Sequence, residues 1–248
     1  MKSTVLAVAL ILLGVGLTAA GLFGQFVLSD DEGHHDGREP TFALQSALGA
    51  DELIVREDEP RQLAVSVERA GQPIQSYDDV HGAPMHVFAV TTDLTEFRHV
   101  DPGFVDGEFE PVEVSGGEYR VVVQTAPSGG PDLLELGLDV STSGEPLLSG
   151  QLISASDVYE LPSGVNVERQ GFDFVLSEPW QGDEYHGEPA LLTMFRADDI
   201  AFVHAHAETP SDNRFRFSLD LPGRGEYLAA LEFVHDGDVQ TALFRIEV

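Results

Sequence analysis

Short apolar runs, separated by glycine, proline and polar residues, recur along the chain from residue 53 onward. In residues 63–68 and 85–90 the side chains change character with a period of two, which is typical of β-strands. Many short strands with turn residues between them favour an all-β sandwich. The same pattern predicts further strands in the first half at 97–101, 109–114, 118–124 and 133–140.

The second half repeats this order of strands and turns. A closing hairpin ends at Val248 and turns at Asp236-Gly237, a dipeptide that favours a tight two-residue β-turn. The other strands predicted in this half lie at 150–154, 171–176, 189–195, 200–206 and 214–219.

Two stretches of the chain read as copies of each other. A His-Gly-x-Pro sequence begins at His81 and again at His186, and with no gap between the copies a Phe-x-His sequence ends at His99 and at His204. A Gly-Glu-Tyr sequence also occurs in both halves. These matches predict two tandem immunoglobulin-like β-sandwich domains of one fold, at residues 46–142 and 143–248.

The stretch from Ser3 to Ser29 is uncharged and rich in Leu, Val, Ala and Gly. Because about 20 apolar residues span a bilayer, a transmembrane anchor at 1–29 is favoured over a cleaved signal peptide. Lys2 before it and acidic residues after it predict a cytoplasmic N-terminus and an extracellular body, which would be secreted if the segment were cleaved. Residues 30–45 are expected to form a flexible acidic linker.

The charge balance is strongly acidic: 43 acidic residues stand against 13 basic ones, for a formal net charge of −30, and Lys2 is the only lysine. The acidic residues are spread over both halves, which favours a halophilic protein solvated in concentrated salt, where the screening length is ~3 Å at 1 M. Nucleic acid is not an expected partner, because such a surface repels phosphates. The absence of cysteine excludes disulfides, thiolate metal ligands and a cysteine nucleophile.

Histidines are concentrated in the two related stretches. In the first, a short turn joins the strands of His86 and His99, so these histidines are expected to be cross-strand neighbours. Asp101 lies two residues beyond His99 and therefore on the same strand face. Imidazole and carboxylate groups so placed suit copper(II) or zinc(II).

In the second stretch, His204 and His206 occupy alternate positions of one strand and should present neighbouring imidazoles. His186 and His235 are the nearest candidates for a further ligand there. The candidate metal ligands are therefore His86, His99, Asp101, His186, His204, His206 and His235.

A structural role is the alternative for each of these histidines, since a strand histidine can bond a backbone carbonyl or pair with an acidic residue. That role is favoured for His99 and His204 individually, and for His81 and His186 as turn residues. Catalysis is not expected, because the chain has no phosphate-binding glycine loop, no His-Glu-x-x-His, no Gly-x-Ser-x-Gly and no spacing that identifies a triad.

The segment from Met85 to Pro102 resembles a family of exported bacterial and archaeal proteins with a His…Asp-Leu…Phe-x-His-x-His-Pro hairpin, associated with copper and heavy-metal handling and similar to immunoglobulin-like copper chaperones. The resemblance extends over residues ~50–248. It assigns the family's strand histidine to His86, where the second copy has Leu191. Its hairpin histidines correspond to His99 and Asp101 in the first copy and to His204 and His206 in the second.

These observations lead to one main functional hypothesis and two alternatives. The main one is a membrane-anchored extracytoplasmic module that binds or buffers a transition metal, copper or zinc, near a membrane-protein partner. The alternatives, both with structural histidines, are a non-catalytic module that binds another protein and an accessory subunit of a membrane complex.

Overall fold

The computed structural model describes residues 45–144, 153–211 and 213–248. The predicted anchor at 1–29 and nearly all of the predicted linker at 30–45 lie outside these residues. Throughout the described residues the regular elements are β-strands, and no helix there is long and apolar enough to cross a membrane. The strands pair antiparallel, apart from one parallel contact between β13 (Ile153–Ser154) and β21 (Asp238–Glu247). The all-β prediction is therefore confirmed.

The first half contains two sheets and a small ribbon. One sheet has the order β1-β2-β3-β10, with β4 paired to β3, and the other has the order β12-β11-β6-β7, with β5 paired to β11. The first sheet contains β1 (Ala47–Leu48), β2 (Asp51–Glu59), β3 (Gln62–Arg69), β4 (Gln72–Pro73) and β10 (Val112–Glu113). The second contains β5 (Tyr77–Asp78), β6 (Met85–Thr91), β7 (Phe97–Val100), β11 (Gly117–Pro127) and β12 (Leu134–Thr142), and the ribbon pairs β8 (Phe104–Val105) with β9 (Glu108–Phe109).

The second half also contains two sheets. Their orders are β13-β21-β20-β17-β18 and β14-β15-β16-β19, and every strand pairing in the described residues joins strands of the same half. The first of these sheets contains β13 (Ile153–Ser154), β17 (Leu191–Arg196), β18 (Phe202–His206), β20 (Glu226–His235) and β21 (Asp238–Glu247). The second contains β14 (Val158–Glu160), β15 (Asn166–Gln170), β16 (Asp173–Leu176) and β19 (Arg214–Arg216).

Most predicted strands are present, although several differ in length. The strand expected at 109–114 is interrupted between β9 and β10, because Pro111 has no amide hydrogen to donate to a sheet ladder. The strand expected at 214–219 ends at Arg216. The closing hairpin turns at Asp236-Gly237, as expected, and both residues have positive φ.

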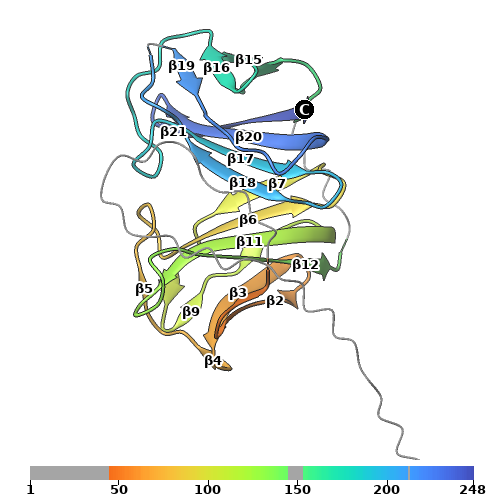
Figure 1. Cartoon of the computed structure of the whole chain (residues 1–248), viewed down its shortest axis with the longest axis vertical. Coiled ribbons are helices and arrows are strands. Elements are labelled where there is room, and N and C mark those ends of the chain that lie inside the picture. The colour runs from red at the N-terminus through yellow and green to blue at the C-terminus, as the bar shows by residue number, and fades with distance from the viewer. Residues whose placement is uncertain (1–44, 145–152, 212) are drawn as a thin grey trace, which may run out of the picture. The chain divides into compact units, whose positions relative to one another are not determined.

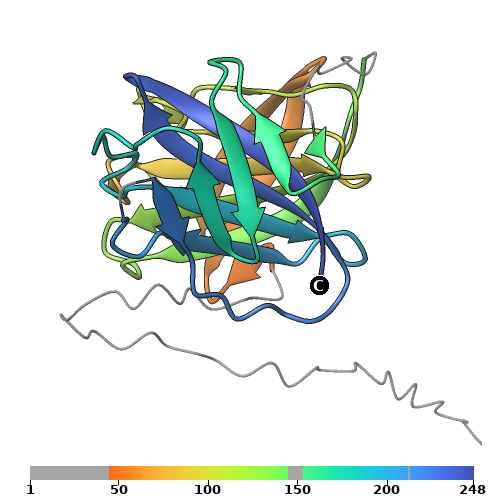
Figure 2. The same cartoon turned by 90° about the horizontal axis from the view of Figure 1, so that it is seen from above.

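The sheet that contains β6 and the sheet that contains β17 lie next to each other in Figure 1 and pack against each other, so we call them the inner sheets. Seen from above, the stacked sheets overlap (Figure 2). Phe88 of β6 and Val122 of β11 belong to the same apolar cluster as Leu192 of β17 and Ala230 of β20. All seven residues of β6 are buried, since its other face packs against the outer sheet of the first half. Each inner sheet therefore has both faces covered.

Alternate side chains of β6 point to opposite faces of its sheet, and this decides which of them lie between the two halves. Met85, Val87 and Ala89 enter the core of the first half. Phe88 faces the second half, and His86, two residues before it, points to the same side. A strand that is covered on both faces thus carries its histidine into the contact between the inner sheets.

The two His-Gly-x-Pro sequences form the same tight turn. His81 has φ 48° and His186 has φ 57°, and the glycine that follows each also has positive φ. Backbone bridges close the turns between Val80 and Ala83 and between Tyr185 and Glu188. Two successive residues with positive φ define a type I′ turn, a conformation in which histidine is tolerated better than bulky residues.

The two Gly-Glu-Tyr sequences also have matching structures. Tyr119 and Tyr227 are fully buried at the starts of β11 and β20. The Tyr119 hydroxyl accepts a hydrogen bond from the Ser115 amide, and the Tyr227 hydroxyl donates one to the Gly223 carbonyl, each to a residue four positions upstream. The sequence repeat therefore corresponds to a repeated local structure.

Candidate metal centre

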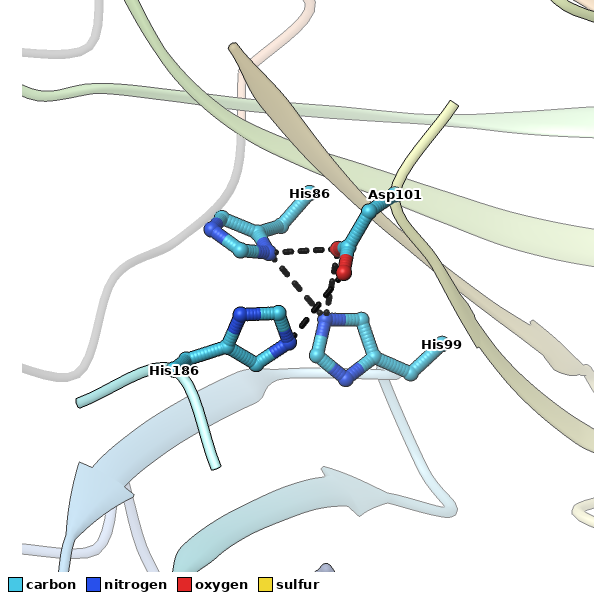
Figure 3. Close-up of side chains that lie close together, drawn as sticks. All are labelled: His86, His99, Asp101 and His186. Carbon is cyan, nitrogen blue, oxygen red and sulfur yellow. Dashed lines mark hydrogen bonds and ion pairs between the residues drawn. The ribbon is translucent and has the colours of Figure 1, made fainter. Parts of the chain in front are cut away.

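His86, His99, Asp101 and His186 form what we call the central cluster, in which one nitrogen or oxygen atom of each side chain lies within 4.8 Å of the others (Figure 3). The first half provides His86 from β6, His99 from β7, and Asp101 directly after β7. His186 comes from the turn that precedes β17 in the second half. The cluster is therefore assembled from both halves.

The hydrogen bonds of His86 fix which ring nitrogen carries the hydrogen. Its Nε2 atom lies 2.7 Å from the carbonyl oxygen of Val80, which can only accept, so Nε2 donates. In the neutral ring the Nδ1 atom then carries no hydrogen and presents a lone pair. That atom lies 2.7 Å from Asp101 Oδ1 and 3.3 Å from His99 Nε2.

His186 donates through Nδ1 instead of Nε2, but it too keeps one ring nitrogen without a hydrogen. Its Nδ1 atom donates to the carbonyl oxygen of His81 at 3.1 Å, which leaves a lone pair on Nε2 in the neutral ring. The Nε2 atom lies 3.1 Å from Asp101 Oδ2, yet it is buried and makes no hydrogen bond of acceptable geometry. Burial lowers the pKa of His186, but the contact with Asp101 outweighs it and the net shift is upward.

His99 completes the set. Its Nδ1 atom donates to Glu232 Oε2 of β20 at 2.9 Å, and both side chains are at most 4% exposed. The lone pair on Nε2 therefore faces His86 and Asp101. The Tyr185 hydroxyl lies 3.4 Å from His99 Nδ1, and burial, followed by the charges of Glu232 and Asp101, raises the pKa of this phenol, which stays neutral.

Asp101 supplies the negative charge of the cluster. Burial raises its pKa, but the contacts with His186 and His86 outweigh burial, so the net pKa lies below the ordinary value and the carboxylate is ionised. Its side chain is 30% exposed, whereas those of His86 and His99 are at most 3% exposed. Asp101 is therefore the side of the cluster that is nearest to solvent.

The separations between donor atoms fit a metal ion. Zinc bound at ~2.0–2.1 Å to four tetrahedral ligands has ligand atoms about 3.3 Å apart. The measured separations are 3.3 Å for His86 Nδ1 to His99 Nε2, 3.5 Å for His99 Nε2 to Asp101 Oδ1 and 3.1 Å for His186 Nε2 to Asp101 Oδ2. The fourth, 2.7 Å for His86 Nδ1 to Asp101 Oδ1, needs an outward shift of about half an ångström to reach that geometry.

Four of the seven residues predicted from the sequence thus meet in the central cluster, and the other three lie elsewhere. His206 lies with His81 and Glu188 in a second group, which we call the turn cluster. His204 shares a hydrogen bond of 3.1 Å with Thr193 and is buried, and burial lowers its pKa well below the ordinary value. His235 lies 3.8 Å from Asp236 at the end of β20 and belongs to neither cluster.

Sequence reasoning missed the groups that orient the ligands. Two are backbone carbonyls, of Val80 and His81, which no side-chain pattern reveals. The third is Glu232, and here a signal exists, because it is a single acidic residue within an apolar stretch of β20 from Tyr227 to Val234. A buried acidic residue in an inner strand implies a partner.

A family profile described as a domain of unknown function (DUF8832) matches residues 166–248, roughly a third of the chain. The match spans β15 to β21 and includes His186, His204 and His206. No curated protein sequence matches the chain.

Proposed function

We propose that this protein binds a divalent transition metal ion, copper(II) or zinc(II), at the central cluster, as a membrane-anchored binding or buffering module outside the cytoplasm. One observation supports the metal most strongly. His86, His99 and His186 each use one ring nitrogen to donate to a fixed oxygen acceptor, and the other nitrogens converge on the Asp101 carboxylate. Metal-binding histidines characteristically donate their second N–H to a carbonyl or carboxylate in this way.

Electrostatics favours a metal over the alternative without one. Without a cation, lone pairs and carboxylate oxygens would face one another at hydrogen-bond distance, unless His86 and His186 were both protonated. That arrangement places two imidazolium ions in a largely buried site in which Asp101 is the one carboxylate of the cluster. A divalent ion bound by these lone pairs would supply the same positive charge.

The donor set indicates the type of ion. Three imidazole nitrogens and one carboxylate suit zinc(II) and copper(II), whereas copper(I) prefers sulfur. The chain has no cysteine, and Met85 and Met194 are fully buried in apolar clusters. The resemblance of residues 85–102 to proteins associated with copper handling supports copper.

The proposed location rests on the sequence. The apolar stretch from Ser3 to Ser29 supports an N-terminal anchor, and the acidic residues after it support an extracellular body. The net charge of −30 supports a halophilic setting. For the fold, the repeated strand order and the buried tyrosines Tyr119 and Tyr227, each bonded four residues upstream, support immunoglobulin-like sandwiches, in which a tyrosine corner recurs.

The test is a titration of the full-length protein with copper(II) and, separately, with zinc(II), in detergent and molar salt. Calorimetry measures the affinity, and proton release is measured in the same experiment. We expect the tightest site of the wild type to be weakened by Asp101→Asn about 100-fold or more, beyond the ~10–100-fold typical of changes around the ligands. Asp106→Asn, at an exposed turn of the same half, is the matched control and should leave the affinity unchanged.

Two outcomes would contradict the proposal. If the wild type binds neither ion, the central cluster is an ion network and the protein-interaction alternative is favoured. If Asp101→Asn and Asp106→Asn have equal affinity, the ion binds elsewhere.

A further inference from the structure

The turn cluster is a second meeting point of donor atoms from both halves. One nitrogen or oxygen atom from each of His81, Glu188 and His206 lies within 4.8 Å of the others. His206 Nδ1 lies 3.3 Å from Glu188 Oε1, and the rings of His81 and His206 are 4.6 Å apart between centroids. His81 comes from the first half, and the other two residues come from the second.

The sequence repeat relates the turn cluster to the central cluster. His81 and His186 occupy the same position of the repeated turn. His206 and Asp101 also occupy equivalent positions. His206 is opposite Leu191, and Asp101 comes one residue after Val100, the β7 residue opposite Val87, so it lies at the position opposite His86. The contact of His81 with His206 is therefore the counterpart of the contact of His186 with Asp101.

Three substitutions distinguish the counterparts. Leu191 stands where the first half has His86, so the turn cluster lacks a strand histidine. Glu188 stands in the turn where the first half has Ala83, and it provides the carboxylate of the turn cluster. His206 stands where the first half has Asp101. Two imidazoles and one carboxylate are the result.

From this arrangement we propose that His81, Glu188 and His206 form a second metal site, which holds a zinc(II) or copper(II) ion with part of its coordination shell open to solvent. Two histidines and one carboxylate are a recurrent ligand set for a metal that keeps an open position. The turn cluster offers three protein ligands, one fewer than the central cluster. A metal ion bound there therefore keeps a coordination position for a water molecule.

The two sites are neighbours. His186 donates to the backbone oxygen of His81, and the rings of His81 and His86 are 6.2 Å apart between centroids. Two divalent ions at so short a distance repel each other, so the second ion binds more weakly than the first. An open, weaker site beside a closed, tighter one is suited to rapid exchange with solvent.

Zinc(II) binding to the full-length protein in molar salt tests this inference. Stoichiometry is measured by native mass spectrometry and elemental analysis, and the release of each equivalent to excess EDTA is followed in time. The wild type should bind two equivalents, one released at least tenfold faster than the other. Glu188→Gln should lose the fast equivalent and keep the slow one, and Asp101→Asn should do the reverse. Glu184→Gln, at an exposed position in the same loop, is the matched control.

The outcomes separate this inference from the proposed function. Two equivalents that are both unaffected by Glu188→Gln overturn the second site, as does a single equivalent that only Asp101→Asn removes, in which case the central site still stands. A single equivalent that only Glu188→Gln removes supports the turn cluster and overturns the central site. Because Glu188 is partly exposed, Glu188→Gln is expected to fold, and His81→Gln provides a second variant of the same site.

Discussion

The β6–β7 hairpin and the β17–β18 hairpin have the same register, but the histidines at equivalent positions make different contacts. Phe88 is opposite His99 in the first, and Thr193 is opposite His204 in the second. His99 donates to the carboxylate of Glu232 and turns its other nitrogen toward the central cluster. Its counterpart, the buried His204, makes its hydrogen bond with Thr193.

The comparison shows that the position of a histidine in the repeat does not determine its role. The role follows from the groups that the opposite half places around it, namely a carboxylate for His99 and apolar side chains such as Phe88 for His204. The two halves can thus share a backbone register while the same repeat position contacts a carboxylate in one half and aromatic side chains in the other.

The largest expected difference between the hairpins is in stability. Phe88 is 1% exposed and its ring contacts those of His99, Phe202 and His204. Phe88→Ala should lower the free energy of unfolding by about 3–5 kcal/mol, because it leaves a cavity between the inner sheets. Thr193→Ala, at the equivalent position, should cost about 1–3 kcal/mol, because it leaves a ring nitrogen of buried His204 without its hydrogen bond. Denaturant unfolding in molar salt measures both, and equal losses would show that the inner sheets do not share a core.

A smaller effect is expected at Glu232, which distinguishes His99 from His204. Glu232→Gln removes the charge that holds the N–H of His99, so the affinity of the central cluster for zinc(II) should fall by about 10–100-fold. Glu226→Gln, on the same strand but paired with Arg245, is the control and should leave the affinity unchanged. If the two variants bind zinc(II) equally well, Glu232 does not orient a ligand.

The smallest effect is a gain. Leu191→His places in the second hairpin the histidine that the first hairpin has at His86, opposite His206. A fourth protein ligand should tighten zinc(II) binding at the turn cluster by about tenfold, because it closes an open coordination shell. The rate of zinc release to EDTA from the faster site is the measurement. An unchanged rate would contradict the equivalence of the two clusters.

The strands and hairpins were largely predictable because their signals are local. Alternation in residues 63–68 and the Asp236-Gly237 turn depend only on neighbouring residues, and both are present. The proximity of His86, His99 and Asp101 was also predictable, since one short hairpin joins them. Local patterns were sufficient up to the level of one sheet.

The contribution of the second half to this site was not predictable. Sequence reasoning grouped His186 with His204 and His206, whereas the structure places it against Asp101. The packing of two inner sheets decides this, and it depends on apolar side chains far apart in the chain, such as Phe88 and Phe202. The nearly continuous apolar character of 191–195 and 227–234 is typical of strands covered on both faces, but it does not show which sheet covers them.

The central claim is that both halves provide ligands to one metal ion, and anomalous diffraction at the zinc edge from crystals of the zinc-loaded full-length protein tests it most directly. We predict an anomalous peak within ~2.0–2.2 Å of His86 Nδ1, His99 Nε2, His186 Nε2 and an Asp101 oxygen. A zinc ion bound only by residues of one half, or no peak between the inner sheets, would contradict the account.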